Sequence, residues 1–280
     1  MATPMRIVDS QVHIWAASTP ERPWPPRHAA QREIPLGADE LLQSMDAAGV
    51  DGAILVPPSW EGERNDLVLA AAAAHPDRFA VMGRVDPDDP STPERIATWR
   101  AQPGMLGLRF SLHRPGLAES LATGNMDAVF RSAEAHDVPI MLLVPHTGMH
   151  HIDAVAARYP GLRLVLDHLG IPSSVPAAER FTRLDELLKL ARHANVAVKA
   201  SALPALAEDE YPYRSLHAPM RRVCDAFESR RVFWGSDLSR LPCTYRQAVT
   251  QIAQEMPWLS EDDKHWIMGR GVCEWLDWKR

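Results

Sequence analysis

Cysteine is scarce in this sequence, with 3 residues among 280, far apart and without a CxxC pair. An odd number of scattered cysteines indicates neither a disulfide framework nor a cysteine-based zinc site. A lone cysteine is usually a packing residue, which disfavours Cys243 as a nucleophile. The first ten residues contain no apolar secretory segment, so we expect a cytoplasmic protein.

Long apolar runs and clustered positive charge are also missing. The longest apolar run, residues 67–74, is rich in alanine and too short to cross a bilayer. Lysines and arginines are scattered and the net charge is −6, whereas a nucleic-acid-binding protein usually carries a basic stripe. We therefore expect a small-molecule substrate, with neither a membrane nor a nucleic-acid partner, while the oligomeric state stays open.

Short apolar segments alternate with helical patterns along the whole chain. Strands are predicted at residues 6–13, 53–56, 79–85, 105–110, 138–144, 163–166, 196–200 and 232–234. Several of these segments are nearly continuous apolar runs, which strands buried on both faces require. Helices are predicted at residues 40–48, 65–74, 125–136, 152–158, 178–193, 220–229, 245–255 and 261–275.

The ends of two predicted helices carry recognisable signals. Gly49 follows the first helix as a C-terminal glycine, and Ser260 with Asp263 forms a capping-box pattern before the last. Eight strands that alternate with helices predict an α/β fold with a parallel sheet. We expect this sheet to close into a single (β/α)8 TIM barrel, a fold of about 250 residues, as one domain over residues 1–280.

The connection after the first strand, residues 14–38, is unusually long. Connections of this length are usually functional or disordered. Its tryptophans and prolines favour an ordered loop that forms a lid or a pocket wall over the barrel mouth, although simple packing on the top face is the alternative. Trp15, Trp24 and Trp60 are therefore candidates for lining a pocket.

Polar residues end the first strand, and active sites of such barrels lie at the C-terminal strand ends. The two-residue period of a strand places Asp9, Gln11 and His13 on one side. If Val12 faces the helices, all three face the barrel axis, where buried polar groups need partners. For His13 alone, a hydrogen-bonded structural histidine is as well supported as a functional one.

The other strand ends carry polar residues as well, namely Arg109, His146, His168, Lys199 and Asp237, with Arg240 shortly after the last strand. A buried arginine usually binds an anion, which for Arg109 could be a substrate carboxylate or an internal aspartate. Each position is a weak signal by itself. Their common location at successive strand ends is what predicts a site.

These segments carry a resemblance to a known family. Residues 8–15, 107–110, 167–170, 198–201 and 235–237 resemble the amidohydrolase superfamily, in its amidohydrolase 2 branch of TIM-barrel hydrolases, and the likeness runs over roughly residues 6–275. That branch includes sugar-lactone hydrolases, 2-pyrone-4,6-dicarboxylate lactonase and sulfomuconolactone hydrolase. Aromatic-acid decarboxylases are related to it.

The resemblance implies a metal-site pattern from which this chain departs. The family carries His-x-His on the first strand, and Gln11 stands at the first of these histidines. His13, His168 and Asp237 match the remaining positions, and His146 could occupy the position of the strand-five histidine. An amide is a poor zinc ligand beside histidine or a carboxylate. We therefore expect no required cofactor, while a single divalent metal such as zinc, held by His13, His168 and Asp237 or by His146 in place of His168, stays open.

A binuclear centre is not expected. Arg109 stands where binuclear members carry a carbamylated lysine, and Lys199 lies on the seventh strand instead.

The resemblance implies a hydrolase of a small lactone, carboxylate-bearing or sugar-derived. Asp237 would activate water, and His13 and His168 would polarise the carbonyl. The substrate would contact Arg109, Lys199, Gln11, His146, Trp24 and Arg240. The alternatives are a decarboxylase or hydratase of an aromatic-derived acid, and a non-catalytic barrel retained as a binding protein.

Overall fold

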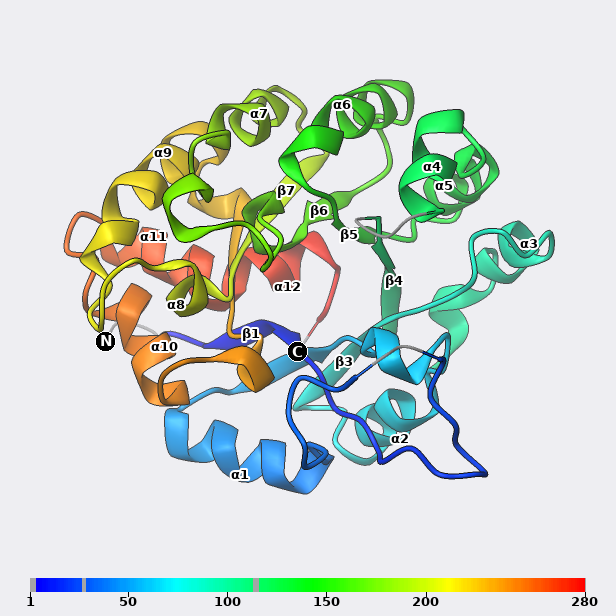
Figure 1. The fold of residues 1–280 in the computed structure, drawn as a ribbon, viewed down its shortest axis with the longest axis horizontal. Coiled ribbons are helices and arrows are strands. Elements are labelled where there is room, and N and C mark those ends of the chain that lie inside the picture. Colours follow the sequence, from blue (N-terminus) through cyan, green and yellow to red (C-terminus); the bar gives the residue numbers. More distant parts are fainter. Residues whose placement is uncertain (1–3, 27–28, 113–115, 280) are drawn as a thin grey trace.

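Eight parallel strands follow one another in chain order as hydrogen-bonded neighbours in a single sheet. The computed structural model describes residues 4–26, 29–112 and 116–279. The strands are β1 (Val8–Val12), β2 (Gly52–Leu55), β3 (Phe79–Gly83), β4 (Met105–Ser111), β5 (Ile140–Leu143), β6 (Leu164–Leu166), β7 (Val196–Ser201) and β8 (Val232–Gly235). All eight predicted strands are confirmed, with ends that differ by a few residues. Helices surround the strands (Figure 1).

The ring is joined where β8 meets β1. The Asp237 amide donates to the Gln11 carbonyl over 2.9 Å, and the Ser236 amide donates to the Asp9 carboxylate over 2.8 Å. A Cβ atom on Gly235 would lie 2.8 Å from the Ser10 hydroxyl, so glycine permits this close approach. The structure is therefore a TIM barrel, as predicted.

The helices are α1 (Ala38–Ala48), α2 (Asp66–Ala74), α3 (Thr92–Ile96), α4 (Leu117–Thr123), α5 (Asp127–Ala135), α6 (Met149–Arg158), α7 (Leu184–Leu188), α8 (Leu203–Leu206), α9 (His217–Phe227), α10 (Tyr245–Ala253), α11 (Glu261–His265) and α12 (Gly271–Trp275). Gly49 ends α1 with a φ of 75°, and Ser260 and Asp263 form the predicted capping box of α11. None of the helices in the described ranges is long and apolar enough to cross a membrane.

Two predicted helices are wrong in extent. The segment 178–193 contains one short α-helix, α7, with a 3-10 turn overlapping its start (Ala177–Glu179) and another after α7 (Lys189–Arg192), and the residues just before α7, Phe181 and Thr182, are of low helix propensity. The segment 261–275 is interrupted by a π-helical turn, Trp266–Arg270. Within that turn, a Cβ atom on Gly269 would lie 2.5 Å from the Arg6 carbonyl, so close packing against the chain before β1 accompanies the break.

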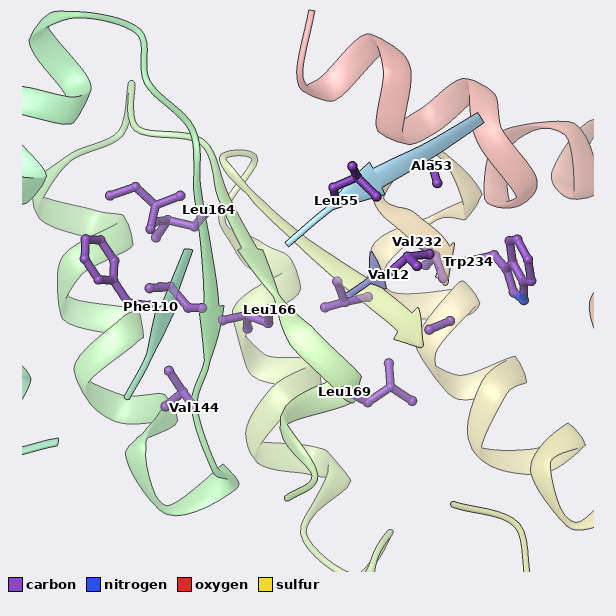
Figure 2. Packing of buried hydrophobic residues seen from close by; sticks show 14 of the residues in the cluster. Val12, Ala53, Leu55, Phe110, Val144, Leu164, Leu166, Leu169, Val232 and Trp234 are labelled. Carbon is purple, nitrogen blue, oxygen red and sulfur yellow. The ribbon is translucent and has the colours of Figure 1, made fainter. Parts of the chain in front are cut away.

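Outward-facing side chains of the strands pack against the surrounding helices. Val12, Leu55, Phe110, Leu166 and Trp234 belong to this layer, and Figure 2 shows them between strands and helices. A second cluster fills the lower interior of the barrel with Val8, Ile54, Met82, Val165 and Phe233. In each strand, successive side chains point alternately toward the barrel axis and toward the helices. The inward-facing side chains nearest the C-terminal ends of the strands therefore lie at the level of the site.

A β-bulge breaks this alternation in β1. Asp9 pairs with Ala53 and Val12 pairs with Leu55, so two residues of β1 oppose a single residue of β2. Asp9 and Val12 consequently lie on the same, outward side of the strand. The prediction that Asp9 shares the inward side with Gln11 and His13 is wrong, because the bulge adds one residue to the two-residue period.

Asp9 instead forms hydrogen bonds with α10 and with the chain just after β8, where β8 meets β1. Its carboxylate accepts the Tyr245 hydroxyl of α10 over 2.7 Å, together with the amides of Ser236 and Gln11. Burial raises the pKa of Asp9 to about 6, and these hydrogen bonds act against that rise. Asp9 thus holds β8 and α10 against β1.

We expect Tyr245→Phe to lower the free energy of unfolding by about 1–3 kcal/mol, because one oxygen of the buried Asp9 carboxylate loses its donor. Urea denaturation measures the loss. Tyr211→Phe is the matched control, since the Tyr211 hydroxyl contacts Thr250 in a partly buried position and should matter less. Equal stability of Tyr245→Phe and the wild type would contradict the role given to Asp9.

Candidate active site

A cavity of about 700 Å³ opens at the C-terminal ends of the strands. Five predicted site residues are among those that line it: His13, Arg109, His168, Asp237 and Arg240. Ala29 and Gln31 of the long loop after β1 form part of its wall, so the loop contributes to the pocket. The volume suits a small molecule rather than a polymer.

The floor of this cavity contains a buried ion-pair network. Asp167, at the end of β6, lies 3.1 Å from Nε of Arg109 and 3.0 Å from Nζ of Lys199. Burial raises the pKa of the Asp167 carboxyl, but the two cations outweigh burial and hold that pKa well below its usual range. The internal aspartate foreseen as one partner of Arg109 is therefore Asp167.

Lys199 is fully buried and acts on the amide of Gln11. Its Nζ donates to Oε1 of Gln11 over 2.7 Å, so the amide nitrogen of Gln11 is turned toward Nε2 of His13, 3.4 Å away. Burial lowers the pKa of Lys199, while Asp167 acts in the opposite direction. Both contacts of Nζ are to acceptor oxygens, which suits an ammonium group.

The tautomer of His13 follows from its hydrogen bonds. Nδ1 lies 2.6 Å from the carbonyl oxygen of Val56, which can only accept, so Nδ1 carries the proton. Nε2 then accepts from the amide of Gln11, 3.4 Å away, and lies 3.4 Å from Oδ1 of Asp237 with no hydrogen between these two acceptors. Burial lowers the pKa of His13 to about 4, and the nearby Asp237 only partly offsets it, so His13 is neutral at pH 7.

In His168 the ring proton is assigned to Nε2, the opposite nitrogen from that in His13. Its backbone amide donates to the Ser201 hydroxyl over 3.2 Å, and the same oxygen lies 2.8 Å from Nδ1 of His168. The hydroxyl hydrogen is then free to donate to Nδ1, which leaves the ring proton on Nε2. Burial lowers the pKa of His168 as well, so this ring is also neutral.

Asp237 supplies the reactive carboxylate. Its backbone has a φ of 51°, which turns the chain sharply after β8, and its amide is fixed by the Gln11 carbonyl. Oδ1 is buried and has no hydrogen-bond partner among the residues that the structure describes. A buried oxygen without a donor is rare in proteins, and here it lies in the lining of the cavity.

Four predicted contact residues are not among the described residues that line the cavity: Gln11 and Lys199 are fully buried beneath it, and His146 and Trp24 lie elsewhere. Nε2 of His146 is 2.8 Å from the carbonyl of Leu169, and neither His146 nor Trp24 is among the described residues that line the cavity. Trp24 packs against the hydrophobic core, whereas Trp60 lies in the wall, with its ring 6.0 Å from that of His13.

Two residues of the site had escaped the sequence-based prediction. Ser111 accepts from Arg109, and Ser201 pairs with His168. Each follows a predicted residue by two positions, Ser111 after Arg109 and Ser201 after Lys199, so strand periodicity was the available signal.

The long loop after β1 is held down by a charged cluster. Arg22 pairs with the buried Glu61 and with Asp66 of α2, and Glu61 also accepts the amide of Ala16 over 3.1 Å. At the other side of the mouth, the Ser239 hydroxyl donates to Gln31. Of its described part, 14–26 and 29–38, Ala29 and Gln31 line the cavity; residues 27 and 28 lie outside the described residues.

Comparison with known proteins identifies the family. A family model described as Amidohydrolase matches residues 8–270, and the chain belongs to this amidohydrolase family, in the branch expected from its motifs. It is 27% identical to an L-fucono-1,5-lactonase of Burkholderia ambifaria over 236 residues, 84% of this chain and 81% of the relative. It is 23% identical to a 4-sulfomuconolactone hydrolase of Hydrogenophaga intermedia over 203 residues, 71% of this chain and 64% of that one.

A solved structure shows the same fold. An amidohydrolase from Burkholderia multivorans with bound zinc superposes with a TM-score of 0.81 at 22% identity, over 97% of this chain and 99% of that one.

The donor set of this chain does not fit a resident metal ion. Nε2 of His13 and Oδ1 of Asp237 face each other, but within the described ranges no group of three or more histidines, cysteines or carboxylates is placed to hold a metal. The group beside Nε2 of His13 is the amide nitrogen of Gln11, which is a donor and cannot bind a metal ion. The Lys199 ammonium donates to the oxygen of the same amide. Zinc sites use at least three protein ligands, commonly histidine, cysteine or carboxylate.

Proposed function

We propose that this protein hydrolyses the ring ester of a small lactone without a required metal cofactor. The observation that carries the proposal is the buried, unpartnered Oδ1 of Asp237, which lies in the lining of the cavity 3.4 Å from Nε2 of the neutral His13. Two curated relatives are named as lactone hydrolases, which supports the same reaction class.

Asp237 is the general base in this proposal. A water molecule donates a hydrogen bond to Oδ1 of Asp237, and its oxygen attacks the carbonyl carbon of the lactone while Asp237 takes the proton. The tetrahedral intermediate then expels the ring oxygen, which takes that proton from Asp237. The product is the open hydroxy acid, and the carboxylate of Asp237 is restored.

The two histidines have different roles. Nε2–H of His168 is a donor, so His168 stabilises the oxyanion that develops on the carbonyl. Nε2 of His13 carries no proton, so His13 leaves Oδ1 of Asp237 free to accept a hydrogen bond from the attacking water. The hydrogen bonds to the Val56 carbonyl and the Ser201 hydroxyl support this division of roles, in place of the sequence-based prediction that both histidines polarise the carbonyl.

The charges of the cavity favour a substrate that carries a carboxylate or another anionic group. Arg240 lines the cavity with an exposed side chain and has no ion pair among the described residues. Arg109 contributes a second guanidinium at the floor, partly neutralised by Asp167. A guanidinium can bind a carboxylate through two parallel hydrogen bonds.

A panel of carboxylated lactones, muconolactones and neutral sugar lactones tests the reaction class. We expect proton release from at least one lactone, unchanged by a chelator, with the anionic substrates preferred. Arg240→Gln should raise KM for the anionic substrates by about 10-fold, the loss of one charged contact. The absence of proton release from every lactone, together with release of carbon dioxide from an aromatic acid, would establish the decarboxylase alternative instead.

Asp237→Asn tests the general base. Because Asn tolerates a φ of 51°, the fold should be retained, and we expect kcat to fall by at least about 100-fold. Thermal unfolding verifies the fold, and steady-state kinetics measure the loss. Asp185→Asn, which removes an exposed ion pair with Arg222, is the matched control and should keep full activity. Near-wild-type turnover by Asp237→Asn would remove Asp237 from its role.

A further inference from the structure

Lys199 is a charged residue of the site that substrate cannot reach. It is fully buried on β7, and it is not among the described residues that line the cavity. Its ammonium is shared between Oδ1 of Asp167 and Oε1 of Gln11. Any influence of Lys199 on the reaction must therefore pass through these two neighbours.

The charges below the cavity do not balance without Asp237. Arg109 and Lys199 bring two positive charges and Asp167 brings one negative charge, while His13 and His168 are both neutral. One positive charge is left over among these buried groups at the floor of the cavity. Buried charges need partners, and the carboxylate of Asp237 is the anion at the same end of the barrel.

The amide of Gln11 links this charge to His13. An amide has one acceptor end and one donor end, and Lys199 occupies the acceptor end at 2.7 Å. The donor end is then left for Nε2 of His13 at 3.4 Å. An ammonium on the oxygen also polarises the amide, which strengthens its N–H as a donor.

We propose that Lys199 is a positioning residue whose ammonium turns the Gln11 amide so that its N–H faces Nε2 of His13, which, together with the Val56 carbonyl at Nδ1, keeps His13 neutral beside Asp237. The role of this arrangement in turnover rests on the proposed hydrolysis; the orientation of Gln11 and His13 does not.

Imidazole nitrogen NMR of the full-length protein tests the proposal without a substrate. In the wild type, His13 should show a protonated Nδ1 and an unprotonated Nε2 at pH 7. Lys199→Met removes the charge and frees the amide to rotate, so that its oxygen can face Nε2, and the His13 signals should move toward protonation of Nε2 while Nδ1 stays protonated against Val56. Gln11→Glu pairs with Lys199 but turns a carboxylate oxygen toward Nε2, so His13 should become doubly protonated.

Two controls separate this effect from general damage. Lys264→Met removes a largely buried lysine whose partner is the exposed Glu261, and it should leave the His13 signals unchanged. If Lys199→Met does not fold, Gln11→Glu, which keeps the lysine and the shape of the side chain, decides the question. Unchanged His13 signals in a folded Lys199→Met or Gln11→Glu variant would overturn the proposal.

Kinetics and metal content complete the test. Once a lactone substrate is known, Lys199→Met should lower kcat on the order of 10- to 100-fold with KM changed less than about threefold, because Lys199 does not contact substrate. Elemental analysis of the wild type should find no stoichiometric zinc; one zinc per chain on Nε2 of His13 would overturn the proposal. Altered His13 signals together with inactivity on every lactone would refute the proposed hydrolysis alone.

Discussion

The ion pairs of Asp167 with Arg109 and Lys199 are the constraint on which the rest of the site depends. Two cations around one anion are stable inside a barrel only if further groups accept their hydrogen bonds and balance their charge. Gln11 accepts a hydrogen bond from Lys199, and in the arrangement that we propose the carboxylate of Asp237, at the same end of the barrel, offsets the remaining charge. The floor of the cavity is thereby organised before any substrate arrives. Hydrogen bonds from neighbouring residues orient the two histidines that face the cavity.

The barrel converts this floor into a site through the geometry of its strand ends. Inward-facing residues alternate with outward-facing ones, so Lys199 lies one layer below Ser201, and Arg109 lies one layer below Ser111. The left-handed backbone at His168 and Asp237 then turns both side chains over the floor. Such conformations are unfavourable for most residues and persist where the surrounding structure holds them.

The sequence alone predicted the barrel because each strand is a distinct apolar segment and the helices separate them regularly. It also predicted five of the residues that line the cavity, since all of them lie near or just after the C-terminal ends of strands. Asp9 was misplaced because a β-bulge in β1 leaves no mark in the sequence. The positions of His146 and Trp24, and the orientation of the Gln11 amide, depend on contacts between residues far apart in the chain, such as Leu169 and Lys199.

A single turnover in water labelled with ¹⁸O, followed by mass spectrometry of product and protein, tests most directly the claim that Asp237 activates water rather than attacking the lactone itself. Direct attack by water places the label in the carboxylate of the hydroxy acid and leaves Asp237 unlabelled. Label in the side chain of Asp237, with an unlabelled product, would show a covalent intermediate and contradict the account.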